Sequence, residues 1–149
     1  MAHWLTFPRI QDPRGNLSFA QQLPFSVMRC YWIYGIEPEA VRGGHAHKTL
    51  ERILIPVSGS LVASVDGFPY SLYQPWRGIY IGPMEWLDMS SFAHGTACMV
   101  LASAVYDEMD YIRTYSEYLK IKAAVAQTVE RLPCKQVVEG STPSGGTND

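Results

Sequence analysis

Cysteines are few in this chain: Cys30, Cys98 and Cys134 are the only three among its 149 residues. An odd number of widely spaced cysteines indicates neither a disulfide framework nor a C-x-x-C metal site. A domain of this length buries roughly 68–70% of the surface of its unfolded chain, so it needs no covalent staple. We therefore expect a disulfide-free protein in a reducing compartment, the cytoplasm.

An excess of charge and long apolar runs are also missing. The 12 Lys and Arg side chains stand against 14 Asp and Glu, which gives a net charge of -2. This balance provides no general attraction to nucleic acid or to an anionic membrane, so any anionic ligand must be held by individual arginines. No segment approaches the roughly 18 apolar residues of a membrane span, and residues 1–9 do not resemble a signal peptide. We expect a soluble protein with no nucleic-acid or membrane partner.

Short apolar runs rich in β-branched and aromatic residues make up most of the chain, and each is bounded by Gly, Pro, Asp or Ser. This pattern is typical of an all-β sandwich or barrel. Asp66-Gly67 is in addition a strong hairpin signal. The expected strands are 17–21, 26–34, 45–57, 61–65, 70–72, 78–81, 85–89 and 97–103.

One helix is expected near the end, over residues 107–120. Asp107 can cap its start, and Lys120 lies at the end where the helix dipole favours a cation. Its tyrosines recur at helical spacing, which is more often a packing stripe than a binding site. These tyrosines are Tyr111, Tyr115 and Tyr118.

The composition changes after Lys122, because no aromatic residue follows Tyr118 and the chain ends in Gly, Ser, Pro and Thr. Such a segment cannot bury enough surface to offset the entropy lost on ordering it. We expect one domain over residues 1–122 and a disordered tail over 123–149.

The densest chemistry lies in residues 41–51, where Arg42, His45, His47 and Glu51 occur together. If a single strand runs from residue 45 to 57, the two histidines and Glu51 share one face. That face would continue with Ile53, Ile55 and Val57. Two imidazoles that face an apolar interior are costly unless they are hydrogen-bonded, bound to a metal or used on a substrate.

Arg29 lies in a mostly apolar strand and so needs an anionic partner or a wet cavity. Strand alternation puts Arg29, Tyr31 and Ile33 on one face. Two locations are compatible with this arginine: a pocket beside the histidines, or a dimer interface. The opposite, apolar face favours a homodimer; it consists of Met28, Cys30, Trp32 and Tyr34. Arg14, in a turn near the start, either faces solvent or holds a phosphate.

The histidine stretch is similar to the first motif of the cupins, H-x-H followed by Glu, a hydrophobic strand and a Gly turn. Its residues here are His45, His47, Glu51 and Gly59. Many cupins bind a transition metal with a further histidine from a second motif. That motif keeps Gly78 and Pro83 here, but Leu87 stands where the ligand would be expected. Stable metal sites usually have three or four protein ligands, so a metal-dependent cupin enzyme is the less favoured alternative.

Four motifs in order resemble the sugar nucleotide 3,4-ketoisomerases of the WxcM-like cupin group, over about residues 5–120. They are Asp12-x-Arg14-Gly15-x-Leu17, Arg42-Gly43-x-His45-Ala46-His47-Lys48-x-Leu50-Glu51, Gly78-x-Tyr80-x-x-Pro83-x-x-Trp86, and Val100 to Ser103 followed by Tyr106 to Arg113. The resemblance implies an all-β cupin jelly-roll homodimer that uses no metal and no other cofactor. It implies that the substrate is dTDP-4-keto-6-deoxyglucose and that the keto group moves from C4 to C3, in dTDP-3-amino-3,6-dideoxyhexose biosynthesis.

The candidate residues suit such a reaction. Catalytic candidates are His45, His47, Arg42 and Tyr31, and substrate-binding candidates are Arg14, Arg29, Glu51 and Trp86. An imidazole with a pKa of about 6.5 can remove and return protons near neutral pH. Arg42 would stabilise an enolate oxygen or hold the diphosphate. Which histidine is the base and which the acid stays open, as does the configuration at C4. A non-catalytic sugar nucleotide binding module is the third alternative, although binding alone would not demand both histidines.

Overall fold

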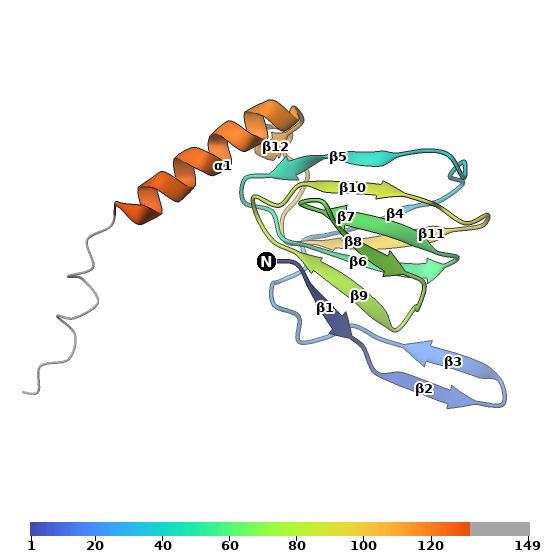
Figure 1. Ribbon diagram of the computed structural model, residues 1–149. Helices are drawn as coiled ribbons and strands as arrows, with labels where there is room; N and C mark the ends of the chain where they lie inside the picture. Colours follow the sequence, from blue (N-terminus) through green and yellow to red (C-terminus); the bar gives the residue numbers. More distant parts are fainter. Residues whose placement is uncertain (132–149) are drawn as a thin grey trace, which may run out of the picture.

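The computed structural model describes residues 1–131, so most of the expected tail, residues 132–149, lies outside the described part. Two five-stranded antiparallel sheets face one another and form a jelly roll, with one helix at the end of the described chain (Figure 1). The predicted all-β cupin fold with one C-terminal helix is confirmed. In chain order the elements are β1 (His3–Thr6), β2 (Arg9–Asp12), β3 (Gly15–Ser18), β4 (Arg29–Ile33), β5 (Arg42–His47), β6 (Arg52–Ser58), β7 (Leu61–Val65), β8 (Phe68–Leu72), β9 (Arg77–Ile81), β10 (Leu87–Ser90), β11 (Ala97–Ala102), a 3-10 turn (Glu108–Asp110), β12 (Tyr111–Ile112) and α1 (Tyr115–Glu130).

One sheet has the order β1-β9-β6-β11-β4 and the other the order β12-β5-β10-β7-β8. Apolar side chains from both sheets fill the space between them and bury the main core. Its fully buried members include Leu54, Leu61, Ile79, Leu87 and Val100. A second, smaller cluster contains Phe7, Ile53, Ile55 and Leu101. The sheet that contains β6 is therefore covered by apolar side chains on both of its faces.

The expected single strand over 45–57 is wrong. The chain forms β5, turns at residues 48–51 and enters β6 in the opposite sheet. Asp110 holds this turn, because its carboxylate accepts hydrogen bonds from the backbone N–H groups of Thr49 (2.9 Å) and Leu50 (3.1 Å). The turn breaks the alternation of side chains, so Leu54 faces the main core while Ile53 joins the second cluster.

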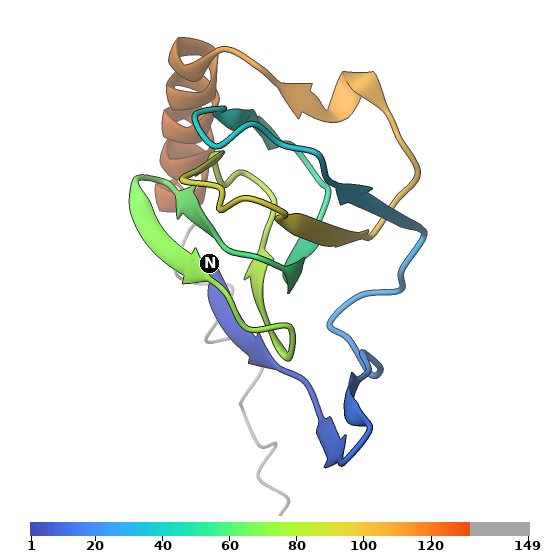
Figure 2. The ribbon, with the colours of Figure 1, turned by 90° about the vertical axis from the view of Figure 1, so that its right-hand side faces the viewer.

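The strand predictions elsewhere are close to the structure. Strand 61–65 is confirmed as β7, and the Asp66-Gly67 turn joins it to β8 in an antiparallel hairpin. Two short strands near the start were not predicted: β1 pairs with β9, and β2 pairs with β3. The β2–β3 hairpin projects from the rest of the molecule (Figure 2), and all of its residues are exposed.

The expected helix over 107–120 is wrong at both ends. Asp107 does accept a hydrogen bond from a backbone N–H, that of Met109, but it begins only a 3-10 turn. The next two residues pair with β5 as β12, and the helix starts at Tyr115. Asp107 therefore acts as a cap, but for a 3-10 turn, because the free edge of β5 pairs with the chain before an α-helix can begin. The helix also passes Lys122, so the expected domain boundary falls inside α1.

Tyr118 anchors the helix to the barrel and is the buried residue of α1. Its ring lies 5.4 Å from that of Trp86, and Tyr115 lies 5.1 Å from the same ring. Lys122 adds an ion pair to Asp66 at 2.8 Å. The packing role is therefore confirmed for two of the three tyrosines. Beyond this contact the helix extends away from the barrel (Figure 1).

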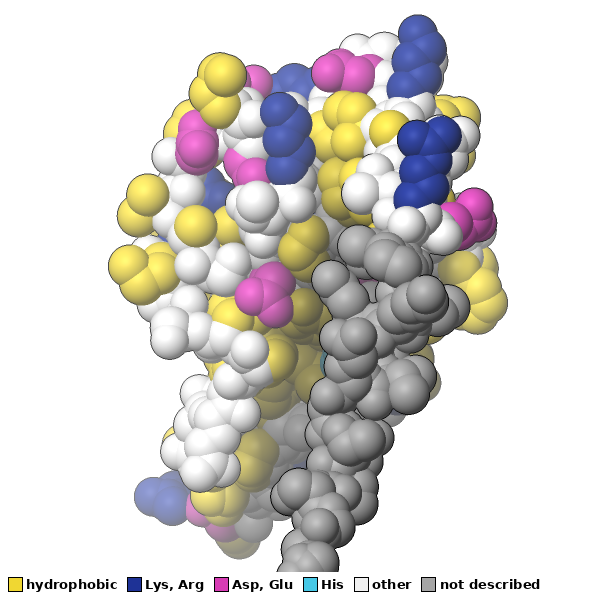
Figure 3. Space-filling view, turned by 90° about the vertical axis from the view of Figure 1, so that its left-hand side faces the viewer, with side chains coloured by type: hydrophobic (Ala, Val, Ile, Leu, Met, Phe, Trp, Pro, Cys, Tyr) yellow, Lys and Arg dark blue, Asp and Glu magenta, His cyan; other side chains and the backbone are white. Residues whose placement is uncertain are grey.

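The surface carries charges of both signs. On the face in Figure 3, Lys and Arg side chains are interspersed with Asp and Glu and with hydrophobic side chains. Within residues 1–131, no helix is both long and apolar enough to cross a bilayer.

Candidate active site

Two glycines shape the strand that carries the histidines. Gly43 and Gly44 have φ angles of 91° and 69°, where side chains other than hydrogen are strained. A Cβ atom on Gly43 would lie 2.6 Å from the carbonyl oxygen of Leu87. Glycine therefore lets β10 approach β5 closely, and the pair is irregular between Leu87 and Asp88. Just beyond this point the side chains of His45 and His47 enter the barrel.

The two histidines lie side by side, as strand alternation predicts. Their ring centroids are 5.0 Å apart with the rings perpendicular. The ring of Tyr111 completes the group, at 4.2 Å from His47 and 5.0 Å from His45. His47 is buried and His45 is half-buried. Tyr111 was predicted to pack on a helix, but because it lies in β12, opposite His47, it contacts the histidines instead.

A cavity of about 580 Å³ opens beside His45. Four candidate residues come together on its wall: Arg29, Tyr31, Arg42 and His45. Tyr111 and Arg113 also line it. A much smaller cavity of about 50 Å³ lies next to His47 and shares Arg29 and Tyr111 with the first. The structure therefore gathers the HxH pair, two tyrosines and three arginines from three separate segments of the chain.

β4 supplies the arginine and tyrosine on the far wall. Its burial alternates as predicted, with Arg29, Tyr31 and Ile33 half-buried and Cys30 and Trp32 exposed. The guanidinium carbon of Arg29 lies 5.1 Å from the centre of the Tyr31 ring. Burial raises the pKa of the Tyr31 hydroxyl, so this group stays protonated near neutral pH. It can therefore donate as well as accept a hydrogen bond.

Arg113 forms part of the cavity rim. It makes an ion pair with Glu108 (2.7 Å) and lies 4.2 Å from the centre of the Tyr111 ring. Hydrogen bonds from Arg113 lower the pKa of Glu108 to about 2. The carboxylate therefore stays charged and holds the guanidinium at the rim.

Asp110 lies behind His47. Its Oδ2 atom is 3.4 Å from Nδ1 of His47. The carboxylate also accepts from the Thr49 hydroxyl at 2.7 Å, in addition to the two backbone N–H groups of the turn. The turn that follows β5 therefore holds the Asp110 carboxylate in place. A carboxylate in this position favours the His47 tautomer with the proton on Nδ1, which leaves Nε2 as an acceptor.

Arg52 lies on the inner side of the histidines. It is 1% exposed, and its Nη1 atom is 3.2 Å from Nε2 of His45. Burial, and then the charge of Arg52, lower the pKa of His45 to about 4 and that of His47 to about 3. Both imidazoles are therefore neutral at pH 7.

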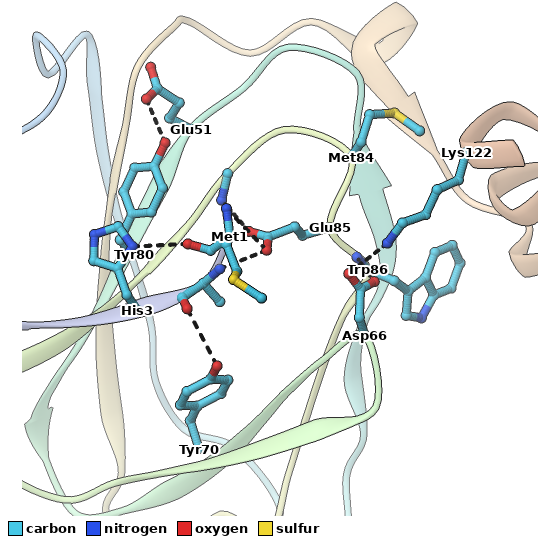
Figure 4. A network of polar contacts seen from close by, with 12 residues as sticks. Met1, His3, Glu51, Asp66, Tyr70, Tyr80, Met84, Glu85, Trp86 and Lys122 are labelled. Atoms are coloured by element: carbon cyan, nitrogen blue, oxygen red, sulfur yellow. Dashed lines mark hydrogen bonds and ion pairs between the residues drawn. The ribbon is translucent and has the colours of Figure 1, made fainter. Parts of the chain in front are cut away.

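Glu51 does not join this group. Its Oε1 atom accepts a hydrogen bond from the Tyr80 hydroxyl at 2.6 Å, near His3 and away from the cavity (Figure 4). The turn between β5 and β6 is the reason, because it ends the alternation that would have put Glu51 beside His47. The prediction that Glu51 lies on the histidine face is wrong.

Trp86 and Arg14 also lie outside the cavity. Trp86 is buried, and its ring packs against α1 next to Asp66 and Lys122 (Figure 4). Its Nε1 atom donates to Asp88 at 3.0 Å. Arg14 sits at the turn of the projecting β2–β3 hairpin, where it pairs with Asp12 at 2.7 Å. The structure of one chain does not bring either residue to the histidines.

Four residues of the site were not among the candidates: Arg52, Asp110, Tyr111 and Arg113. Three of them belong to the segment from Tyr106 to Arg113, which carried the family resemblance but was interpreted as helix. Arg52 stands in the middle of an apolar run, and an arginine in such a place indicates a buried polar contact. The interpretation of 45–57 as a single strand put it on the outer face.

Known proteins resemble this chain over most of its length. Residues 1–123 match the family FdtA, described as WxcM-like, C-terminal. The TDP-4-oxo-6-deoxy-alpha-D-glucose-3,4-oxoisomerase of Aneurinibacillus thermoaerophilus is 38% identical over 128 residues, which are 81% of this chain and 92% of that protein.

Solved structures agree with this match. A 3,4-ketoisomerase from Helicobacter canadensis superposes with a TM-score of 0.77 at 38% identity, covering 80% of this chain and 96% of that one. A mutant of the 3,4-ketoisomerase QdtA from Thermoanaerobacterium thermosaccharolyticum, in complex with TDP-4-keto-6-deoxyglucose, has a TM-score of 0.78 and 35% identity, covering 80% and 91%. The chain therefore belongs to the FdtA family of WxcM-like proteins.

Proposed function

We propose that this protein is a sugar nucleotide 3,4-ketoisomerase that moves the keto group of dTDP-4-keto-6-deoxyglucose from C4 to C3. One observation carries the proposal: two neutral imidazoles lie 5.0 Å apart, and one of them, that of His45, lines a cavity together with three arginines. The relatives named as 3,4-ketoisomerases or oxoisomerases at 35–38% identity support the same reaction.

The reaction moves two protons and requires no net oxidation. A base removes the proton from C3, which the neighbouring carbonyl acidifies. The C–H electron pair forms a C3=C4 double bond, and the C4 oxygen takes up a proton to give an enediol. The C3 hydroxyl then loses its proton and becomes the ketone while C4 takes a proton on carbon. Each step needs a group that can hold or give a proton near neutral pH, which a neutral imidazole does.

We assign the two protons to His45 and His47, with Tyr31 and Tyr111 as hydrogen-bonding partners of the sugar. The three arginines that line the cavity suit the two charges of a diphosphate, because a guanidinium group can donate two hydrogen bonds to phosphate oxygens. These are Arg29, Arg42 and Arg113. Arg42 lies on the same strand as the histidines and remains the candidate for stabilising the enolate oxygen.

A metal-dependent reaction fits the residues less well. Within residues 1–131, no three His, Cys, Asp or Glu side chains gather in a way that could hold a metal ion. Nε2 of His45 already faces the guanidinium of Arg52, and Leu87 lies across from the same histidine. A cation beside two imidazoles disfavours a second cation there. A binding module without catalysis is also less favoured, because binding does not require a His47–Asp110 pair.

We also propose that two copies form a homodimer. β4 is an edge strand that exposes Trp32 at 63%, and Tyr34, directly after the strand, is 71% exposed. The projecting hairpin exposes Ile10 and Leu17 as well. Apolar surface of this kind usually meets a partner. A second copy would cover both regions and would bring the Arg14 of one chain close to the surface of the other.

The location proposed for the enzyme is the cytoplasm. Cys30 is exposed and Cys98 is buried, and both are free thiols. An exposed free thiol is stable where glutathione keeps thiols reduced. Cys134 lies outside the described residues.

Incubation of the purified protein with dTDP-4-keto-6-deoxyglucose, followed by NMR of the product, tests the function. The expected result is a C3 ketone, and the coupling of H4 to H5 gives the configuration at C4. Unchanged substrate, with a relative from the same family active in parallel, would contradict the proposal.

A further inference from the structure

Arg52 is a cation with almost no access to solvent, at 1% exposure. Its Nε and Nη2 atoms have no hydrogen-bond partner in residues 1–131, and its Nη1 atom lies 3.2 Å from Nε2 of His45. Arginine is almost never fully buried unless it is paired, because its five N–H donors lose their hydration. The polar contact that this guanidinium makes is therefore with a histidine and not with a carboxylate.

The direction of that hydrogen bond follows from chemistry. A guanidinium can only donate, so Nε2 of His45 must accept. In a neutral imidazole the other nitrogen, Nδ1, then carries the proton. A proton on Nε2 would instead put an N–H group opposite an N–H group of a cation.

We propose that Arg52 is a positioning residue of the active site, which holds the His45 ring by its Nε2 atom in one tautomer and opposes its conversion to imidazolium. The inference rests on the proposed function, because the state of this ring matters only if the ring moves protons. Arg52 lies in β6 and does not line the cavity, so it acts through His45 rather than on the substrate.

Other charged and polar groups also face His45, and Arg52 must outweigh them. Burial is the largest cause of its lowered pKa of about 4, and Arg52 is the next. Arg113, beyond β12, lowers the pKa further, while the Gly43 carbonyl of β5 and Asp88 of β10 raise it. The neighbouring rings are those of His47 and Tyr111. Arg52 is thus the strongest of the individual groups that act on this imidazole.

The test combines histidine NMR with kinetics on the full chain. In protein labelled with ¹⁵N at histidine, His45 should show its proton on Nδ1. Arg52→Gln keeps a donor but removes the charge, and we expect the pKa of His45 to rise by roughly 1–3 units. The acid limb of the kcat/KM profile should move in the same direction. Loss of the ring's orientation should lower kcat about 10²-fold with little change in KM.

Arg52→Lys and Arg77→Gln are the matched controls. Lysine keeps the charge, so this variant should retain most of the wild-type titration. Arg77 stacks over Trp4 at 4.0 Å, away from the cavity, and its replacement should change neither the titration nor kcat.

Two results would overturn the proposal: a wild-type His45 with its proton on Nε2, or an unchanged His45 titration in Arg52→Gln. If the Gln variant does not fold, the tautomer of His45 in the wild-type protein and the titration of His45 in Arg52→Lys still test the proposal. Wild-type protein without isomerase activity would instead overturn the proposed function, and the NMR titration would still decide the role of Arg52.

Discussion

Leu87 pairs directly with His45 where β10 lies against β5, and its side chain is buried in the core between the sheets. The position at which the second cupin motif would supply a metal-binding histidine is therefore filled by hydrocarbon. The sequence already shows leucine where the motif would have its histidine. The register of the two strands adds that this leucine lies directly opposite His45. The pair of imidazoles faces an apolar side chain on one side and the guanidinium of Arg52 on another.

Metal independence is the first prediction. Treatment with a strong chelator should leave the isomerase rate unchanged, because the donor set is two histidines beside a cation. The measurement is activity before and after dialysis against chelator, with metal content determined on the same samples. Stoichiometric iron, zinc or manganese together with chelator-sensitive turnover would favour a metal-dependent enzyme.

Loss of either histidine should lower turnover strongly and preserve the fold. His45→Asn and His47→Asn keep a hydrogen-bonding side chain and remove the imidazole that would accept and return a proton. Each change should lower kcat by roughly 10²–10⁴ while nucleotide affinity changes much less. Circular dichroism and a nucleotide titration check that the variants fold and bind. Near wild-type rates in both variants would show that the pair is structural.

Stability should fall on mild acidification because of the same histidines. Folding lowers the pKa of His45 to about 4 and of His47 to about 3, whereas an unfolded histidine has a pKa of about 6.5. Between about pH 6.5 and pH 4 the unfolded chain binds protons that the folded chain does not, so protons favour unfolding. Urea midpoints should decrease from pH 7 to pH 5. The decrease should be smaller in His47→Gln, and an equal slope in both proteins would contradict this account.

The chain beyond Lys122 should be dispensable, although α1 continues to Glu130. The contacts that anchor the helix, Tyr118 on Trp86 and Lys122 on Asp66, remain when the chain ends at residue 122. The melting temperature of the truncated protein should stay within a few degrees. Tyr118→Ala in the full chain is the contrast, with an expected loss of about 3–5 kcal/mol for a buried aromatic side chain. A large loss of stability on truncation, together with a small loss in Tyr118→Ala, would show that the residues beyond Lys122 anchor the helix and that Tyr118 does not.

The dimer should depend on the exposed apolar residues of the hairpin and β4. Light scattering at micromolar concentration should give the mass of two chains. Leu17→Lys, which puts a charge on an exposed apolar position, should shift the equilibrium toward single chains. Phe68→Lys is the control, because Phe68 is equally exposed but lies on β8 in the other sheet. A single-chain mass for the wild-type protein would contradict the homodimer.

The sequence by itself determined the family, the jelly roll and the principal histidine pair. Alternation along β4 and β5 placed Arg29, Tyr31, His45 and His47 on inward faces, because side chains on a strand alternate regardless of what surrounds it. Local signals also identified the hairpin at Asp66-Gly67 and the helix anchors Tyr115 and Tyr118.

Tertiary structure decided the rest of the site. Arg52 faces His45, and Glu51 faces Tyr80, because the turn held by Asp110 sends the chain from one sheet to the other. Tyr111 lies in a strand and not in the expected helix, because the edge of β5 offers it backbone hydrogen bonds. Periodicity in a sequence describes one element at a time. Which element follows a turn into which sheet depends on contacts between residues about 60 positions apart, such as Asp110 with Thr49 and Leu50, which local pattern does not contain.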